Sequence, residues 1–150
     1  MTERRIELPD LSNGAIRLHP SGLLLGSSTT EAGFRSTTEG TASAVLAANP
    51  PHLSYRLAAA YDLGGTPVGL SLSFSFELLT RARIFVFTGA QSSGDRSEER
   101  ELRHRDILEN LLHKAYGNVR TFPWGRVRAA YDSRSGGSSI SVSYEGSRGR

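Results

Sequence analysis

The side chains of this chain that could do chemistry are four histidines, fifteen acidic residues and many serines, and there is no cysteine. His104 and His113 lie nine residues apart in a segment of helical periodicity, so they would point to opposite sides of a helix. The sequence lacks the spacings of a serine-hydrolase elbow, a phosphate-binding loop, a dinucleotide-binding turn and a zinc-protease helix. We therefore expect a protein that is not an enzyme and that binds no cofactor or metal.

Three further residues, His52, Asp62 and Asp132, are the remaining candidates for acid or base catalysis. A hydrolase would need such groups to meet in one cleft. Asp132 opens a glycine-rich segment, where aspartate commonly forms a turn by accepting a backbone hydrogen bond. Turn formation is the better explanation of Asp132, and a hydrolase is a third hypothesis behind two binding functions.

Two segments carry serine at every second position, which is the period of a strand with two different faces. The serines are Ser71, Ser73 and Ser75 in the first segment and Ser139, Ser141 and Ser143 in the second. Solvated sheet faces usually carry charged residues, whereas small neutral side chains permit close approach. The pattern predicts a face covered by another element, a second copy or a partner protein; the alternative is a merely polar face.

The C-terminal part of the chain is basic, because residues 110–150 hold seven Lys and Arg against two acidic residues. Trp124 shares strand parity with Arg126 and Arg128, and Arg134 lies on the connector that follows. An indole beside guanidinium groups can stack bases and neutralise phosphates, or bind an acidic protein surface. The alternative places Trp124 in the core, because the single tryptophan of a small domain is usually buried.

The elements that position these residues can be read from periodicity. Residues 68–76 alternate strictly and predict a strand, paired with residues 52–61 through a Gly-Gly-Thr-Pro reversal, and residues 82–88 predict a third strand. A helix capped by Asp95 or Ser97 is predicted next, with an apolar stripe at helical spacing over residues 104–115 and with Gly117 suited to its C-terminus. Strands flanking residues 132–137 predict a C-terminal hairpin.

The first fifty residues give weaker signals. Residues 22–26, Gly-Leu-Leu-Leu-Gly, could form a brief strand, and residues 29–36 predict one helical turn that begins at Thr29 or Thr30 and is anchored by Phe34. Residues 1–10 and 146–150 offer little to bury, and we expect both ends to fray.

The composition is that of one folded domain. At 150 residues and 37% hydrophobic content, the chain can bury one core and is too apolar for disorder. Residues 1–75 hold five Arg against six acidic residues, while residues 76–150 hold thirteen Lys and Arg against nine. The lack of cysteine and of an apolar run near 20 residues favours a cytoplasmic protein without a membrane span.

The segment "TFPWGRVRAAYDSRSGGSSISVSY" resembles a group of small, mostly uncharacterised bacterial proteins. In these a helix ending near "YG" is followed by a Trp-Gly strand and a YDxRSGxSSIxVxY-like hairpin. The segments "SEERELRHRDILENLL" and "GLSLSF" fit the same order, so the resemblance covers about the C-terminal two thirds. It implies a binding protein of accessory or immunity type and provides no catalytic residues.

These observations predict a single α+β domain over residues 1–150. A mainly antiparallel meander of three or more strands would be followed by one long helix, packed on one sheet face, and a C-terminal hairpin. The preferred function is a non-catalytic cytoplasmic protein-binding module, immunity-like or chaperone-like, whose partner is another protein or a second copy on the serine-lined face. The alternative is a nucleic-acid-binding domain that uses the basic hairpin.

Overall fold

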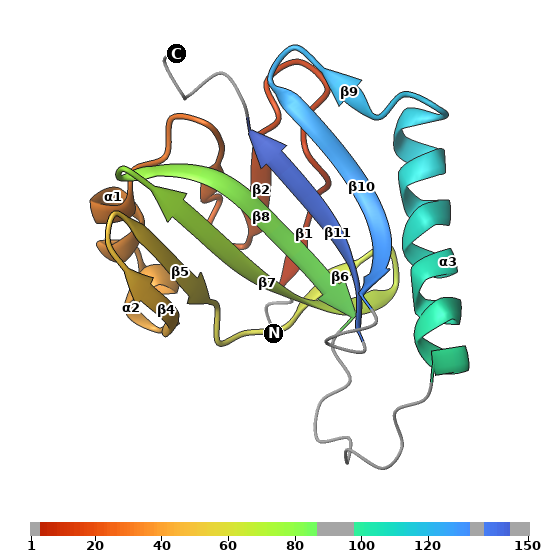
Figure 1. Cartoon of the computed structure of the whole chain (residues 1–150), viewed down its shortest axis with the longest axis horizontal. Helices are drawn as coiled ribbons and strands as arrows, with labels where there is room; N and C mark the ends of the chain where they lie inside the picture. Colours follow the sequence, from red (N-terminus) through yellow and green to blue (C-terminus); the bar gives the residue numbers. More distant parts are fainter. Residues whose placement is uncertain (1–3, 87–97, 133–136, 145–150) are drawn as a thin grey trace.

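The architecture was determined from a computed structural model, which describes residues 4–86, 98–132 and 137–144. Within those residues, 11 strands form one sheet and three helices accompany it (Figure 1). The strands are β1 (Arg5–Ile6), β2 (Ile16–His19), β3 (Leu24–Leu25), β4 (Ala44–Asn49), β5 (His52–Arg56), β6 (Tyr61–Leu63), β7 (Thr66–Ser75), β8 (Leu78–Val86), β9 (Thr121–Phe122), β10 (Gly125–Asp132) and β11 (Gly137–Tyr144). The helices are α1 (Glu31–Arg35), α2 (Thr38–Thr41) and α3 (Glu98–Tyr116).

The sheet is mixed but mostly antiparallel. Its order is β3-β2-β1-β6-β7-β8-β11-β10-β9, while β5 pairs with the second half of β7 and β4 pairs with β5. The pairing of β1 with β6 is parallel. The predicted α+β class and antiparallel character are confirmed. The sheet is much larger than the predicted meander and hairpin, because short strands of the N-terminal third join it.

The hairpin of β7 and β8 lies at the centre of the sheet. Val68, Leu70, Leu72 and Phe74 of β7 are at most 1% exposed, because every second side chain points to the core. The first half of β7 pairs with β6 and the second half with β5. The predicted pairing of residues 52–61 with residues 68–76 is therefore present, but residues 52–61 form two strands, β5 and the start of β6, instead of one.

Helix α3 covers the core side of the C-terminal hairpin. Leu108, Leu112 and Tyr116 are buried and recur every four residues, so they form one stripe that packs on β10 and β11 (Figure 1). Gly117 follows with φ of +65°, the left-handed conformation that ends many helices. The predicted position of the helix on one sheet face is confirmed. With 19 residues, however, it is not a long helix beside a sheet of this size.

The N-terminal third is built on short elements. The side chain of Thr30 caps α1 by accepting a hydrogen bond from the Gly33 amide, and Phe34 is buried, as the sequence predicted. Residues 4–10, which we expected to fray, contain β1 and bury Ile6. Residues 146–150 lie outside the described part of the chain. No helix of the described residues is long and apolar enough to cross a membrane.

Candidate functional site: a basic sheet face

The sheet face opposite helix α3 carries two rows of side chains that cross five strands. The strand register places the first row in the order Arg126, Ser143, Arg81, Ser73 and Ser54. The second row runs in the order Arg128, Ser141, Arg83, Ser71 and Arg56. We call these ten residues the arginine–serine face.

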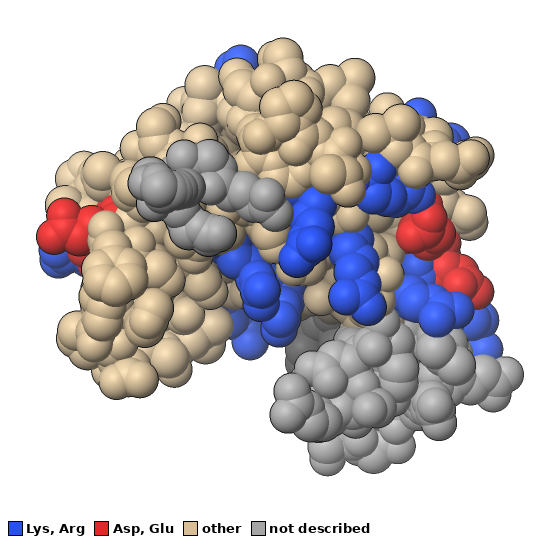
Figure 2. Space-filling model, turned by 45° about the horizontal axis from the view of Figure 1, so that its top comes forward, with Lys and Arg blue, Asp and Glu red and all other residues tan. Residues whose placement is uncertain are grey.

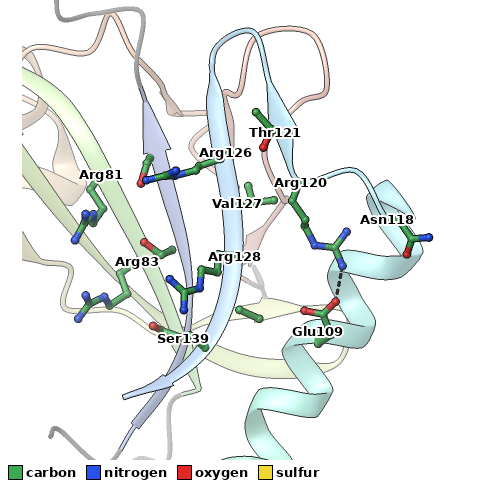
Figure 3. A pocket seen from close by; sticks show the side chains of 14 residues that line it. Arg81, Arg83, Glu109, Asn118, Arg120, Thr121, Arg126, Val127, Arg128 and Ser139 are labelled. Atoms are coloured by element: carbon green, nitrogen blue, oxygen red, sulfur yellow. Dashed lines mark hydrogen bonds and ion pairs between the residues drawn. The ribbon is translucent and has the colours of Figure 1, made fainter. Parts of the chain in front are cut away.

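The register brings the two serine sets of the sequence onto this one face, on either side of β8. The four row serines from β7 and β11 are half-buried, whereas all five arginines are exposed. Figure 3 shows Arg126 and Arg128 of β10 leaning over β11 toward Arg81 and Arg83 of β8. Small serines on the intervening strand leave room for these long side chains.

The spacing of the arginines follows from sheet geometry. Arginines two residues apart on one strand are separated by about 7 Å, and β8 and β10 lie two strand spacings, about 10 Å, apart. Four of the arginines line a hollow of about 730 Å³ between β8, β10 and the end of α3 (Figure 3). In the space-filling view, Lys and Arg side chains gather near the middle of the surface shown (Figure 2). The site is therefore an array of positive charges over an open concave surface.

No acidic side chain neutralises this array within the described residues. None of the five arginines forms an ion pair with a described residue, and neither row contains Asp or Glu. An ion pair joins Arg120 to Glu109 at 2.5 Å, at the helix edge of the hollow. Unpaired guanidinium groups repel one another, and an anionic ligand relieves that repulsion through charge-assisted, bidentate hydrogen bonds.

An aromatic ring, that of Phe85, lies on the same face beside Arg56, at the end of the second row away from Arg128. Phe85 lies over Gly69, where an added Cβ would come within 2.4 Å of the ring. The guanidinium carbon of Arg56 lies 4.8 Å from the centre of the same ring. A cation stacked on an aromatic ring is held in place while its edge remains free to donate hydrogen bonds.

The predicted site residues divide into three groups in the structure. Arg126, Arg128 and the serines lie on the basic face, with Ser139 and Ser75 at its margins; Ser139 lies opposite Phe85, and Ser75 Oγ is 2.8 Å from Nδ1 of His52. Trp124 is not beside the arginines, because it is only 7% exposed and stacks on Phe122 in the core. Arg134 lies outside the described residues.

Sequence reasoning missed Arg56, Arg81 and Arg83. The signal was present, because Arg81 and Arg83 alternate with the buried residues Ala82 and Ile84. We took this strand to be continuously apolar and to begin at Ala82, whereas β8 begins at Leu78. Only the pairing of β8 between β7 and β11 reveals that its arginines stand between the two serine sets.

The candidate catalytic residues do not come together. His52 pairs with Ser75 and Asp62 pairs with Pro67, so they lie at opposite ends of β7, about 27 Å apart. The side chain of Asp132 is outside the described set. Among the described residues, no three His, Asp or Glu side chains are grouped so that they could hold a metal ion.

Comparison with known proteins identifies a fold relative. No protein-family model matches the chain. No curated protein sequence matches it either. A similar solved chain belongs to "Rhs1-CT in complex with cognate immunity protein RhsI1", with a TM-score of 0.58 and 16% identity over 95% of this chain and 88% of that chain. The fold of the present protein is therefore similar to that of a chain from this complex of Rhs1-CT with its cognate immunity protein.

Proposed function

We propose that this protein is a non-catalytic binding module of immunity type, and that it docks an acidic surface of a partner protein on its arginine–serine face. The observation that carries the proposal is the pair of cross-strand rows, in which five exposed arginines have no acidic partner among the described residues. Arginine is enriched at protein interfaces, where its planar group binds carboxylates bidentately.

The fold relative gives independent support, since its structure is named as a complex of Rhs1-CT with its cognate immunity protein RhsI1. Such a likeness at 16% identity concerns the fold, and the binding function is argued from the face itself. The face is formed by regular strands, which hold the arginines in a fixed pattern before any partner arrives. Preorganisation of this kind lowers the entropic cost of binding.

The chemistry of the face favours a protein over a nucleic acid as partner. Proteins that hold single-stranded nucleic acids usually stack bases on exposed aromatic rings. On this face Phe85 is half-buried beneath Arg56, and Trp124 lies in the core. Carboxylates of a folded partner require no stacking platform, and the interleaved serine hydroxyls can donate further hydrogen bonds to them.

The test is affinity capture from a nuclease-treated lysate of the organism that encodes the chain. The bait is compared with Arg83→Glu/Arg128→Glu, which reverses two charges of the face. A matched control, Arg17→Glu/Lys114→Glu, changes two exposed cations elsewhere and has the same net charge. We expect the unchanged bait and the control variant to capture the same partner protein. The face variant should lose it, with binding weakened at least about 30-fold, as removal of an interface hot spot of ~2 kcal/mol would do.

Equal capture by the face variant would disprove docking at this site, provided that circular dichroism shows all three baits folded. Capture of no protein by the unchanged bait, together with turnover of a small substrate by the purified chain, would overturn the proposal as a whole. Loss of the partner from both double variants would indicate a general effect of net charge rather than this face.

A nucleic-acid-binding domain is the second candidate, because the same five exposed arginines can contact phosphates. It predicts that a single-stranded oligonucleotide binds the purified protein with an affinity that falls steeply as salt rises. Replacement of Arg126 and Arg128 by Ala should reduce the slope of log K against log salt by about 0.7 per lost phosphate contact. Failure to retain the protein on heparin or an oligonucleotide at low salt would remove this candidate.

A further inference from the structure

Strand β4 forms an unprotected edge of the described sheet. It pairs only with β5, so the backbone groups on its other side are available for hydrogen bonds. All six of its residues are exposed, including Val45 at 59% and Leu46 at 55%. The other two ends of the sheet, β3 and β9, are two residues long. Short edge strands are protected from pairing with other chains, whereas β4 is not.

The sequence of β4 contains none of the side chains that usually prevent edge pairing, and its only irregularity is a register shift between Val45 and Ala47. From position 44 to 49 it reads Ala-Val-Leu-Ala-Ala-Asn, with no charge and no proline. Natural edge strands commonly carry lysine, an inward charge or proline to prevent association. An uncharged strand meets no like-charge repulsion when it lies antiparallel to an identical strand. A second copy of this chain is therefore the occupant that β4 fits.

We infer that two copies of the chain pair antiparallel through β4 across a two-fold axis that passes between Leu46 and Ala47. In this register Ala44 lies opposite Asn49 of the second copy, and Val45 lies opposite Ala48 of the second copy. The contact is isologous, as closed dimers require. It continues each sheet into that of the other copy by main-chain hydrogen bonds.

The register is selected by the faces of β4. Ala44 and Asn49 pair with Arg56 and His52 of β5, so they lie on the side of the arginine–serine face. Val45 and Ala48 pair with Tyr55 and Leu53, on the core side. Because the register shifts by one residue between Val45 and Ala47, this pairing matches both faces at both ends of the strand. A shift by one residue in either direction would oppose unlike faces.

The dimer would leave the basic faces free and place them on one side of a continuous sheet. The row that ends in Arg56 and Ala44 would continue into Asn49 and His52 of the second copy. The two Arg56 side chains then lie at opposite ends of the β4 pair, so like charges do not face each other across the seam. The inference is independent of the identity of the docking partner.

Cysteine cross-linking tests the register directly, because the chain contains no cysteine. The variant Ala44→Cys/Asn49→Cys should form disulfide-linked dimers under mild oxidation, since opposed residues of antiparallel strands lie about 4.5 to 5.5 Å apart. The two new thiols of one chain are about 16 Å apart along the strand and cannot bridge. The control Ala44→Cys/Ala48→Cys puts the thiols on opposite faces and should stay monomeric on a denaturing gel.

Sedimentation equilibrium measures the association itself. The unchanged chain should show a reversible monomer–dimer equilibrium, and Val45→Lys should weaken dimerisation about tenfold or more. Val119→Lys is the matched control, since Val119 is 53% exposed and lies outside the sheet. A chain that is monomeric up to its highest soluble concentration overturns the inference. Equal cross-linking of both cysteine variants overturns the proposed register. Equal weakening of dimerisation by both lysine variants overturns the use of β4 as the interface.

Discussion

Gly14 lies where the N-terminal segment packs against the C-terminal part of the sheet, in contact with Trp124 and Tyr144. Its φ of +75° lies in the left-handed region, and an added Cβ would lie 2.4 Å from the Trp124 ring. Hydrogen bonds hold the surrounding segment: Tyr116 Oη donates to the Pro9 carbonyl at 2.6 Å, Trp124 Nε1 to the Leu11 carbonyl at 3.0 Å, and Tyr144 Oη to the Gly14 carbonyl at 2.8 Å. The tryptophan ring cannot move aside without breaking its own bond.

Gly14→Ala should therefore destabilise the protein by substantially more than the ~1 kcal/mol expected for a left-handed alanine alone. Gly22→Ala is the matched control, because Gly22 has φ of +82° but nothing within 4 Å of its missing Cβ. Urea denaturation measures both variants. Equal losses would show that the Trp124 contact contributes nothing beyond backbone strain.

At the level of elements, the turn between β7 and β8 has a strained backbone conformation. Phe76 and Glu77 both have positive φ, +51° and +74°, in a position where Asn and Gly are favoured. The turn is held by hydrogen bonds from the Phe76 amide to the Pro51 carbonyl and from the Glu31 amide to the Glu77 carbonyl, both 2.9 Å. Phe76 is nevertheless 73% exposed, so burial of its side chain contributes little to the stability of the fold.

The double substitution Phe76→Asn/Glu77→Gly should raise the free energy of unfolding by about 1 to 2 kcal/mol, because it relieves left-handed strain while keeping every backbone hydrogen bond of the turn. Differential scanning calorimetry of the double variant and of Glu77→Gly alone separates the two contributions. An unchanged or lower Tm would mean that the contact of Phe76 with His52 outweighs the strain.

Most elements could be predicted from local sequence, and the failures have identifiable causes. The alternation of β7, the stripe of α3 and the capping position of Thr30 are properties of neighbouring residues. Strand β1 gave no such signal, because two residues are too few for periodicity and are ordered by their long-range pairing with β2 and β6. The exposed strand β4 likewise depends on its pairing with β5.

At the scale of the whole molecule, buried tyrosines link stability to pH. Burial raises the pKa of Tyr55, Tyr61, Tyr116 and Tyr144 above the usual value of about 10. The hydroxyl of Tyr55 also donates to the buried carboxylate of Glu31, which raises its pKa further. Above pH ~10 the unfolded chain loses these protons while the folded chain keeps them, so unfolding releases protons.

The contribution of these tyrosines to stability should be complete below pH ~10 and should be lost as the pH rises toward their folded-state pKa values. Each buried tyrosine steepens the decline by up to about 1.4 kcal/mol per pH unit. Urea denaturation between pH 8 and pH 11.5 measures the slope. Tyr144→Phe should be less stable at neutral pH, because the Gly14 carbonyl loses its donor, yet show a shallower decline above pH ~10. Parallel curves for the two proteins would contradict the raised pKa of Tyr144.

The sequence by itself determined the α+β class, the central strand β7, the position of α3 and the alternation of serine with apolar residues, because each of these depends on residues close together in the chain. Only the tertiary structure decided what the serines face. Their function depends on which strands become neighbours, and β8 gains β11 as its second neighbour only through pairings across more than fifty residues. The same long-range pairing gathered Arg56, Arg83 and Arg128 into one row. Trp124 lies in the core through other long-range contacts, with Tyr144 and with the Leu11 carbonyl.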